Sequence, residues 1–339
     1  MRVAIVGATG AVGQEFLRLL EERDFPTTKL TLFASERSAG QTRSFRGDEL
    51  TIQAIPEDGN LEADIVFSSA SGSVSKAEAW KWASHGAVVI DNTSAWRMDE
   101  RCPLVVPEIN GEAALGHNGI IANPNCSTII ALMALAPLHK AFGLTRATIA
   151  TYQAVSGAGA AGISELEEQS KAILSGKDVK VEKFQHQIAF NLFSHDSDIG
   201  EDGYNVEERK LLNESRKILS DDALMISATC IRVAVFRAHS EAIHAEFKVP
   251  VTAEAARAVL ANTEGLQVID DRKGNTFPMA ITASDQDDCF VGRIRDDVSK
   301  PGAIAFFVSG DQIRKGAALN AVQIGEHLVN KGAIKELVA

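Results

Sequence analysis

Near its N-terminus the chain reads Arg2-Val-Ala-Ile-Val-Gly7-Ala-Thr-Gly10-Ala-Val-Gly13. The apolar run before Gly7 is typical of a buried parallel strand, and residues 11–22 have the periodicity of a helix. Glycines between a strand and a helix let the backbone approach a pyrophosphate, and the helix N-terminus adds unpaired N–H groups. The stretch therefore predicts a nucleotide-binding βαβ unit. A purely structural turn is the alternative.

Elements of the same kind follow this stretch. Strands alternate with helices over the first 125 residues, which is typical of an α/β, Rossmann-like, doubly wound sheet. The further elements expected there are strands at 29–33, 65–68 and 87–91 and a helix at 76–84. We predict a first domain at residues 1–125, completed by a C-terminal helix within 317–339.

The region between these segments, residues 126–316, has a different pattern. The expected strands are longer and rich in β-branched residues, and they do not alternate regularly with helices. They lie at 145–153, 224–235, 240–249 and 303–309, and the helices lie at 163–175, 206–219 and 253–261. This pattern predicts a second, α+β domain with an open mixed sheet and helices on one face.

Composition excludes several classes of function. Asp and Glu number 45 against 34 Lys and Arg, a net charge of −11. A nucleic-acid partner is not expected, because phosphate backbones attract basic surfaces. No apolar run approaches the ~18 residues of a membrane span, and the start does not resemble a signal peptide, so we expect a cytoplasmic protein without membrane contact. The four cysteines, at 102, 126, 230 and 289, form no CxxC pair, so neither a metal site nor disulfides are expected.

The residues after the second strand bear on the choice of cofactor. Arg37, between Ser35 and Ser38, is suited to a ribose 2′-phosphate, which favours NADP. Glu36 complicates this interpretation, since it could point into solvent or hold a ribose hydroxyl. A solvated loop with a charge pair is the alternative.

Cys126 is the candidate nucleophile. It follows Asn123-Pro-Asn125 and precedes the apolar run 129–135, so it is expected at the N-terminus of a buried helix. There the helix dipole and unpaired N–H groups lower a thiol pKa and could hold an oxyanion. An inert, buried cysteine is the alternative. With a nicotinamide cofactor, a thiolate can add to an aldehyde, and hydride transfer then leaves a thioester.

Several motifs in order resemble those of one family. They include Asn123-Pro-Asn-Cys126-Ser-Thr128, Gln153-Ala-Val-Ser-Gly-Ala-Gly159, Glu207-Glu-Arg-Lys210 and Cys230-Ile-Arg232 with His239, besides 7–13, 35–40, 89–97, 103–110 and 316–323. Over nearly its whole length the chain resembles the aspartate-β-semialdehyde dehydrogenase family. The resemblance implies NADPH-dependent reductive dephosphorylation of β-aspartyl phosphate to aspartate semialdehyde. It also implies a homodimer, and a role in making diaminopimelate, lysine, threonine and methionine.

The resemblance also implies roles for single residues. Cys126 would be the nucleophile, His239 the acid/base, and Gln153 would position the substrate. Arg232 would bind the substrate carboxylate and Glu207 its ammonium, while Arg97, Lys210 and Asn125 would hold phosphate. The residues expected at the cofactor are Gly7, Thr9, Gly10, Ala11, Val12, Gly13, Ser35, Arg37, Ser38, Ser71, Gly157 and Asn320, and residues 126–316 would form the catalytic and dimerisation domain.

The chain departs from the family around His239. Ala234 and Ala238 replace a proline and a glycine, and the loss of the glycine could shift the turn if a positive φ is needed. Arg237 adds a cation that could lower the pKa of His239. Two alternatives stay open: an enzyme like N-acetyl-γ-glutamyl-phosphate reductase, and a non-catalytic, cofactor-binding paralogue.

Overall fold

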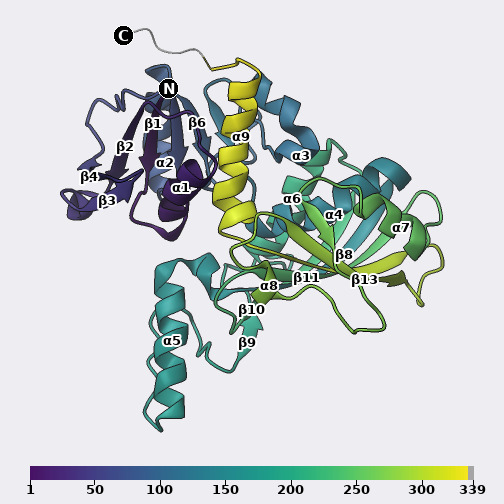
Figure 1. The fold of residues 1–339 in the computed structure, drawn as a ribbon. Coiled ribbons are helices and arrows are strands. Elements are labelled where there is room, and N and C mark those ends of the chain that lie inside the picture. The colour runs from purple at the N-terminus through teal and green to yellow at the C-terminus, as the bar shows by residue number, and fades with distance from the viewer. Residues whose placement is uncertain (335–339) are drawn as a thin grey trace. The chain divides into compact units, whose positions relative to one another are not determined.

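The computed structural model describes residues 1–334 and divides the chain into two compact units. The N-terminal unit comprises Met1–Asn125 and Ala317–Ala339, and the central unit comprises Cys126–Gly316 (Figure 1). Of the C-terminal segment 317–339 expected in the first domain, residues 335–339 lie outside the described part. Within residues 1–334, no helix is long and apolar enough to cross a membrane.

The N-terminal unit is built on a sheet with the strand order β3-β4-β2-β1-β5-β6-β7. All neighbouring strands are parallel except β3 and β4, which are antiparallel. The strands are β1 (Arg2–Val6), β2 (Lys29–Ala34), β3 (Thr42–Phe45), β4 (Asp48–Ala54), β5 (Ile65–Ser68), β6 (Val88–Asp91) and β7 (Ile120–Ala122). The helices are α1 (Ala11–Glu22), α2 (Gly72–Ser84), α3 (Pro107–Asn110) and α9 (Leu319–Asn330), with 3₁₀ turns η1 (Glu36–Ser38) and η2 (Gly111–Gly116).

Helices cover both faces of this sheet because successive strand residues point to opposite sides. Val3 and Ile5 of β1 lie in one apolar cluster with residues of α1 and α9. Ala4 and Val6 lie in a second cluster with Ala79 and Trp82 of α2. The predicted doubly wound α/β sheet is therefore confirmed.

Three strands of this unit were not expected from the sequence. β3 and β4 form a polar edge hairpin, in which exposed residues outnumber buried ones. Arg46 and Gly47 make its turn with positive φ angles of 51° and 87°. β7 has only three residues. A polar edge strand and a three-residue strand both lack the apolar period by which strands are recognised.

The central unit is built on a mixed sheet with the strand order β12-β13-β14-β11-β8-β10-β9. β8 and β10 are parallel, as are β12 and β13, and the other neighbours are antiparallel. The strands are β8 (Leu144–Gln153), β9 (Leu192–Ser194), β10 (Met225–Val233), β11 (His239–Phe247), β12 (Leu266–Val268), β13 (Cys289–Asp296) and β14 (Ile304–Gly310). The remaining elements are α4 (Cys126–Phe142), α5 (Ala160–Leu174), α6 (Val206–Leu219), α7 (Ala253–Leu260) and α8 (Ala280–Ala283), with turns η3 (Val155–Ala158) and η4 (Arg314–Ala318).

Helices α4, α6 and α7 pack against the sheet of the central unit. Alternate residues of β8, from Ala147 through Ile149 and Thr151 to Gln153, are buried, whereas Tyr152 is exposed. The open mixed sheet is confirmed, but the expectation of helices on one face is wrong in one detail, because the short α8 packs against Phe290 of β13 on the face opposite α4. Strands β9, β12 and β13 were not expected.

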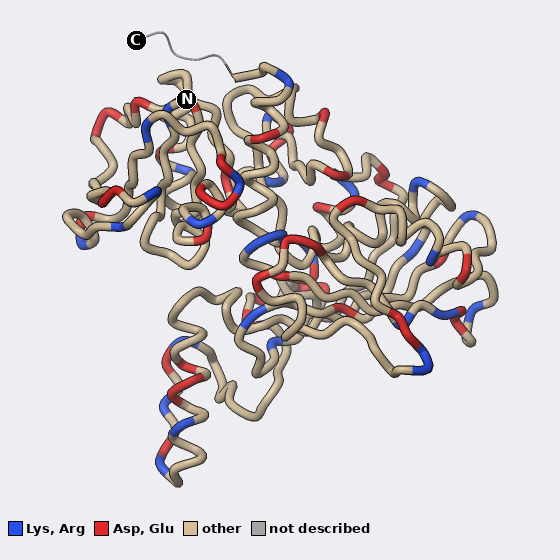
Figure 2. The backbone as a smooth tube through the Cα atoms, viewed as in Figure 1, with Lys and Arg blue, Asp and Glu red and all other residues tan. Residues whose placement is uncertain are grey.

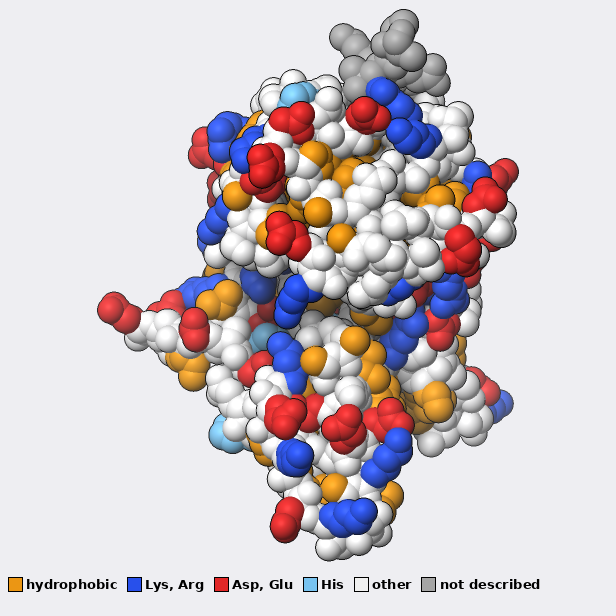
Figure 3. All heavy atoms as spheres, turned by 90° about the vertical axis from the view of Figure 1, so that its left-hand side faces the viewer, with side chains coloured by type: hydrophobic (Ala, Val, Ile, Leu, Met, Phe, Trp, Pro, Cys, Tyr) orange, Lys and Arg blue, Asp and Glu red, His pale blue; other side chains and the backbone are white. Residues whose placement is uncertain are grey.

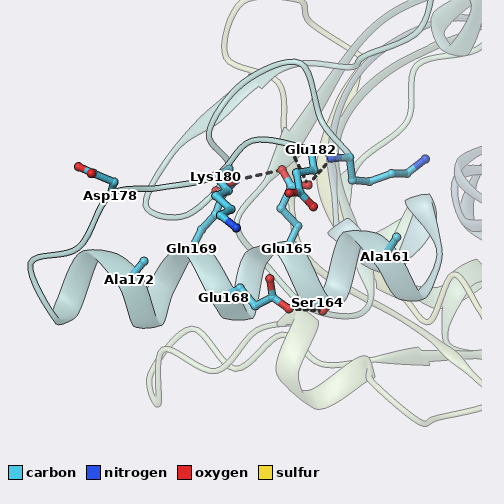
Figure 4. A pocket seen from close by; sticks show the side chains of 10 residues that line it. Ala161, Ser164, Glu165, Glu168, Gln169, Ala172, Asp178, Lys180 and Glu182 are labelled. Carbon is cyan, nitrogen blue, oxygen red and sulfur yellow. Dashed lines mark hydrogen bonds between the residues drawn. The ribbon is translucent and has the colours of Figure 1, made fainter.

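Helix α5 projects away from the sheet of its own unit and carries charges of both signs (Figures 1 and 2). Two polar side chains attach the following segment to it. Glu165 accepts the backbone N–H groups of Glu182 and Lys183 (Figure 4). Gln169 accepts those of Ile188 and Ala189, at 2.9 and 3.1 Å. A cavity of about 570 Å³ lies beside these residues, and none of the predicted site residues lines it.

The net charge of −11 is not gathered in one place on the face that Figure 3 shows, where acidic and basic side chains are interspersed.

Candidate active site

The glycine-rich turn has the geometry that a dinucleotide needs. Gly7 has a φ of +91°, and a Cβ there would lie 2.8 Å from the backbone of Ser69. A Cβ on Gly13 would lie 2.2 Å from the carbonyl oxygen of Gly7, so only glycine lets α1 begin this close to the turn. Within the described residues, no side chain caps α1 at Gly10. Its first N–H groups are therefore available to an anion, and the turn fits a bound pyrophosphate.

Other residues predicted at the cofactor lie at the same edge of the sheet. Ser35, Arg37 and Ser38 follow β2, and Ser71 follows β5; both strands are parallel neighbours of β1. The carboxyl ends of parallel strands meet at one edge, which is where ligands bind to such sheets. Arg37 is exposed in η1, and Ser71 caps α2 by accepting the Val74 N–H at 3.3 Å.

Asn320 contacts the protein through its amide in this structure. It is fully buried in α9, and Nδ2 donates to the Val105 carbonyl at 2.9 Å and to Asn123 Oδ1 at 2.7 Å. Asn123 in turn donates to Asn92 Oδ1 at 2.8 Å. These bonds fix the segment that leads to Cys126. A contact of Asn320 with the cofactor stays a prediction.

Arg97 is held rigidly by the same segment. It is 8% exposed, and its guanidinium donates to the carbonyls of Asn123 and Asn92, each at 2.9 Å. The loop before it is shaped by Asp91, which accepts hydrogen bonds from Ser75 at 2.5 Å and Thr93 at 2.9 Å. Arg97 and the buried Asn125 therefore belong to the N-terminal unit, on the strand-end loops.

Cys126 is the first residue of α4, as expected, and is partly exposed, whereas the other three cysteines are buried. A Cβ on Gly316 would lie 2.9 Å from Cys126 Cβ, so a glycine is required beside it. One turn further along α4, Ile130 lies 3.0 Å from where a Gly310 Cβ would stand, and Gly310 pairs with His239. The first turns of α4 therefore pack at the end of the sheet that carries His239.

Gln153, Glu207 and Lys210 form a connected group in the central unit. Gln153 Nε2 donates to Glu207 Oε1 at 3.1 Å, and Lys210 Nζ lies 2.8 Å from Glu207 Oε2. Thr151 orients the amide further, because its hydroxyl donates to Gln153 Oε1 at 3.1 Å. Glu207 lies in the first turn of α6, where Asn205 and Glu208 form a capping box. The structure thus brings three predicted site residues together.

Arg232 lies at the end of β10, paired with Gln153 of β8. It is 3% exposed, and Nη1 donates to the Ala154 carbonyl at 3.0 Å. Nη2 lies 2.8 Å from His195 Nε2 and 3.1 Å from Asp196 Oδ1. Although burial alone would raise it, the pKa of Asp196 is lowered by the charge of Arg232 and the hydrogen bond between them.

His239 is fully buried beside Arg232, and its tautomer follows from one hydrogen bond. The backbone N–H of Ala154 donates to Nδ1 at 3.0 Å, so the neutral ring carries its proton on Nε2. Burial, and next Arg232, lower the pKa of His239 to about 3, so the ring is neutral at pH 7. Among the described residues, Nε2 has no hydrogen-bond partner. The side chain therefore offers an N–H to a ligand.

Gly157 marks the point that Arg232 and His239 both face. A Cβ built on Gly157 would lie 3.2 Å from Arg232 Nη1 and 3.5 Å from His239 Nε2. A side chain there would occupy the space in front of both donors. Gly157 thus keeps this space open, a function distinct from its predicted contact with the cofactor, which stays a prediction.

The structure shows how Ala238 and Arg237 are accommodated near His239. Ala238 has a φ of +69°, the conformation that the family's glycine suits, and its N–H donates to Gln312 Oε1 at 2.7 Å. The turn is thus kept, although alanine is strained there. Arg237 pairs with Asp311 at 2.6 Å and Asp285 at 2.8 Å. The expectation that Arg237 lowers the pKa of His239 is wrong, because its charge is paired and the shift comes from burial and from Arg232.

Sequence reasoning missed His195, Asp196 and Thr151. His195 and Asp196 reach Arg232 because β9 pairs with β10 just before them, and a three-residue strand has no periodicity to find. Thr151 stands two residues before Gln153 on the same face of β8, a spacing that the sequence does contain. Within the described part of the chain, no group of His, Cys, Asp or Glu is arranged to hold a metal ion.

Acid is expected to destabilise the folded chain through His239. An unfolded histidine titrates near 6.5, whereas the folded pKa is about 3. Between these two pH values, His239 is protonated in the unfolded chain and neutral in the folded chain. As the pH is lowered below about 6.5, the free energy of unfolding should therefore decrease, by up to about 1.4 kcal/mol per pH unit for this group.

Urea unfolding at pH 7, 6 and 5 measures this slope. The matched variant is His239→Asn, whose side-chain oxygen can accept the Ala154 N–H but does not titrate. Its slope should be shallower than that of the wild type. Equal slopes would show that other groups carry the acid dependence.

Comparison with known proteins completes the description of the site. Two family models match: the semialdehyde dehydrogenase NAD binding domain over residues 2–117, and the semialdehyde dehydrogenase dimerisation domain over residues 135–315. The aspartate-semialdehyde dehydrogenase of Aquifex aeolicus is 52% identical, covering 98% of this chain and 99% of the relative. That of Synechocystis sp. is 50% identical over 98% of each chain.

A solved structure agrees with these relatives. The crystal structure of aspartate semialdehyde dehydrogenase II from Vibrio cholerae, complexed with ASA, matches with a TM-score of 0.94 at 44% identity. The match covers 97% of this chain and 98% of that one. Similarity at this level extends over both units and the segments that carry the candidate residues. The chain therefore belongs to the aspartate-semialdehyde dehydrogenase family.

Proposed function

We propose that the protein catalyses the NADPH-dependent reductive dephosphorylation of β-aspartyl phosphate to aspartate semialdehyde, through a thioester at Cys126. One observation carries the proposal: a carboxylate-binding guanidinium and a proton-bearing imidazole face one point. Arg232 Nη1 and His239 Nε2 lie 3.2 and 3.5 Å from the position of a Gly157 Cβ. A small molecule with a carboxylate and a reacting carbonyl matches this pair.

The charged ends of an aspartyl group find partners in the central unit. Arg232 suits the substrate carboxylate, since a guanidinium can donate two parallel hydrogen bonds. Glu207 suits the ammonium, because it is 4% exposed and already accepts N–H groups from the Gln153 amide and the Lys210 ammonium. An N-acetylated substrate has no ammonium to pair with a buried carboxylate. These contacts favour an aspartyl substrate.

The chemistry then follows from residues of the chain. The Cys126 thiolate attacks the acyl carbon of β-aspartyl phosphate, phosphate leaves, and a thioester forms. NADPH, when bound at the glycine-rich turn, supplies the hydride that reduces the thioester. His239 holds its Nε2 proton toward the oxygen that gains charge, and the first N–H groups of α4 add to this stabilisation. The thiohemiacetal collapses to aldehyde and thiol.

Phosphate needs local cations in a protein of net charge −11. We assign it to Arg97, Lys210 and Asn125. Arg97 is pre-organised, because two backbone carbonyls hold its guanidinium. Lys210 is positioned by its ion pair with Glu207 at 2.8 Å.

Replacing Arg37 by alanine is expected to weaken NADP⁺ binding by about 10- to 150-fold and to leave NAD⁺ binding nearly unchanged. The reason is the loss of a charge-assisted hydrogen bond to the 2′-phosphate, worth roughly 1.5–3 kcal/mol. Fluorescence titration with both nucleotides measures the effect. Glu36→Ala is the neighbouring control, and equal loss for both nucleotides would contradict the assignment of Arg37.

The same proposal includes the protein's setting. A homodimer is supported by the match of residues 135–315 to a dimerisation domain. The product belongs to the synthesis of diaminopimelate, lysine, threonine and methionine, which proceeds in the cytoplasm.

A direct assay tests the function. The purified protein should reduce NADP⁺ with aspartate semialdehyde only when phosphate is present, and arsenate should replace phosphate. N-acetyl-γ-glutamyl semialdehyde is the competing substrate and should give no turnover. Reduction at the same rate without phosphate, or preference for the acetylated compound, would overturn the proposal.

A further inference from the structure

Among the described residues, the side chains in contact with the Arg232 guanidinium are His195, Asp196 and Phe184, whose ring centroid lies 5.7 Å from Cζ; of the two neutral ones, only His195 accepts a hydrogen bond. Nη2 of Arg232 approaches His195 Nε2 at 2.8 Å and Asp196 Oδ1 at 3.1 Å. A guanidinium can only donate, so His195 Nε2 must accept, and the imidazole proton must lie on Nδ1. His195 is thus a fixed hydrogen-bond acceptor for Arg232.

The other side of the ring connects Arg232 to the first turn of α6. His195 Nδ1 lies 3.1 Å from Ser197 Oγ, and the Ser197 backbone N–H is directed at Nδ1 from 3.3 Å. The shorter contact with Arg232 requires a protonated Nδ1, which then donates to Ser197 Oγ. The same oxygen accepts the Glu207 N–H at 3.2 Å. His195 therefore joins the two residues that are assigned to the ends of the substrate.

A neutral acceptor has a specific advantage at this position. Asp196 already offsets part of the charge on Arg232, and its side chain is 22% exposed. A second carboxylate in place of His195 would offset the charge that a substrate carboxylate needs. An imidazole orients the guanidinium without removing its charge. A protonated His195 would instead direct an N–H at Arg232.

We propose that His195 is a positioning residue that orients the Arg232 guanidinium for the substrate carboxylate, and that its protonation weakens substrate binding. The inference rests on the role assigned to Arg232 in the proposed function. Burial is the main reason why the pKa of His195 is lowered, so the acceptor form persists at neutral pH. The charged or titratable groups around the ring are Arg232, Asp196, Glu207, Lys210 and His239.

Three variants test the inference by steady-state kinetics in the phosphate-dependent direction. His195→Leu removes the acceptor and should raise the KM for aspartate semialdehyde about 10- to 100-fold, since a hydrogen bond to a charged group is lost. The KM for phosphate and kcat should change by less than about threefold, because neither depends on this contact. His195→Gln places an amide oxygen near the position of Nε2 and should restore most of the affinity. His186→Leu, an exposed histidine in the preceding segment, should behave as the wild type.

The pH dependence separates positioning from a merely structural role. In the wild type, the KM for aspartate semialdehyde should rise as pH falls toward the lowered pKa of His195, and His195→Gln should lose this rise. If His195→Leu does not fold, this comparison alone decides. The inference is overturned if His195→Leu leaves that KM unchanged, or if the Gln variant keeps the acid rise. An inactive wild type, by contrast, would refute the proposed function itself.

Discussion

Cys126→Ala is expected to abolish turnover while NADP⁺ still binds. Removing the nucleophile of a covalent mechanism costs on the order of 10⁶ in kcat where it has been measured. The predicted nucleotide residues belong almost wholly to the N-terminal unit, whereas Cys126 begins the central unit. Stopped-flow absorbance with aspartate semialdehyde measures hydride transfer, and fluorescence titration measures nucleotide binding. Hydride transfer at the wild-type rate would refute the assignment.

The other cysteines provide the control. Cys102 is fully buried in the N-terminal unit, and Cys102→Ala should retain activity. Iodoacetamide should label the native wild type at one position, because Cys126 is partly exposed and the other three are buried. Mass spectrometry after labelling under native conditions gives the number and position of the modified cysteines. Protection by aspartate semialdehyde would place the labelled thiol in the substrate-binding site.

The sequence predicted those parts of the fold that have a strong apolar period. Helix 11–22 and strand 65–68 have the predicted bounds, and α6 spans the predicted 206–219. Their signals are local: an apolar stripe on α1, a fully buried β5, and a capping box at α6. The polar hairpin β3–β4 and the short β9 owe their pairing to neighbouring strands, and a local pattern does not record neighbours.

The site residues also divide into those that the sequence suggested and those that only the structure revealed. The family resemblance pointed to Gln153, Glu207 and Arg232, which the structure joins through hydrogen bonds and strand pairing. His195 could not be found, because its contact with Arg232 crosses 37 residues and depends on β9. The tautomer of His239 could not be predicted from the sequence either, because it is set by the backbone N–H of Ala154.

His239→Asn is expected to lower kcat by about 10²–10³-fold, the range for loss of one hydrogen-bond donor to the oxygen that gains charge. The asparagine oxygen can stand in for Nδ1 and accept the Ala154 N–H, so the variant removes only Nε2, the atom that faces the substrate space beside Gly157. The KM for aspartate semialdehyde should change little, because Arg232 and Glu207 hold its charged ends. His239→Gln, which puts an amide N–H near Nε2, should recover much of the rate, since the amide can donate the same hydrogen bond. Single-turnover hydride transfer compares the three proteins. Wild-type rates in the Asn variant would remove His239 from the reaction, and a Gln variant no faster than the Asn variant would contradict the hydrogen-bonding role.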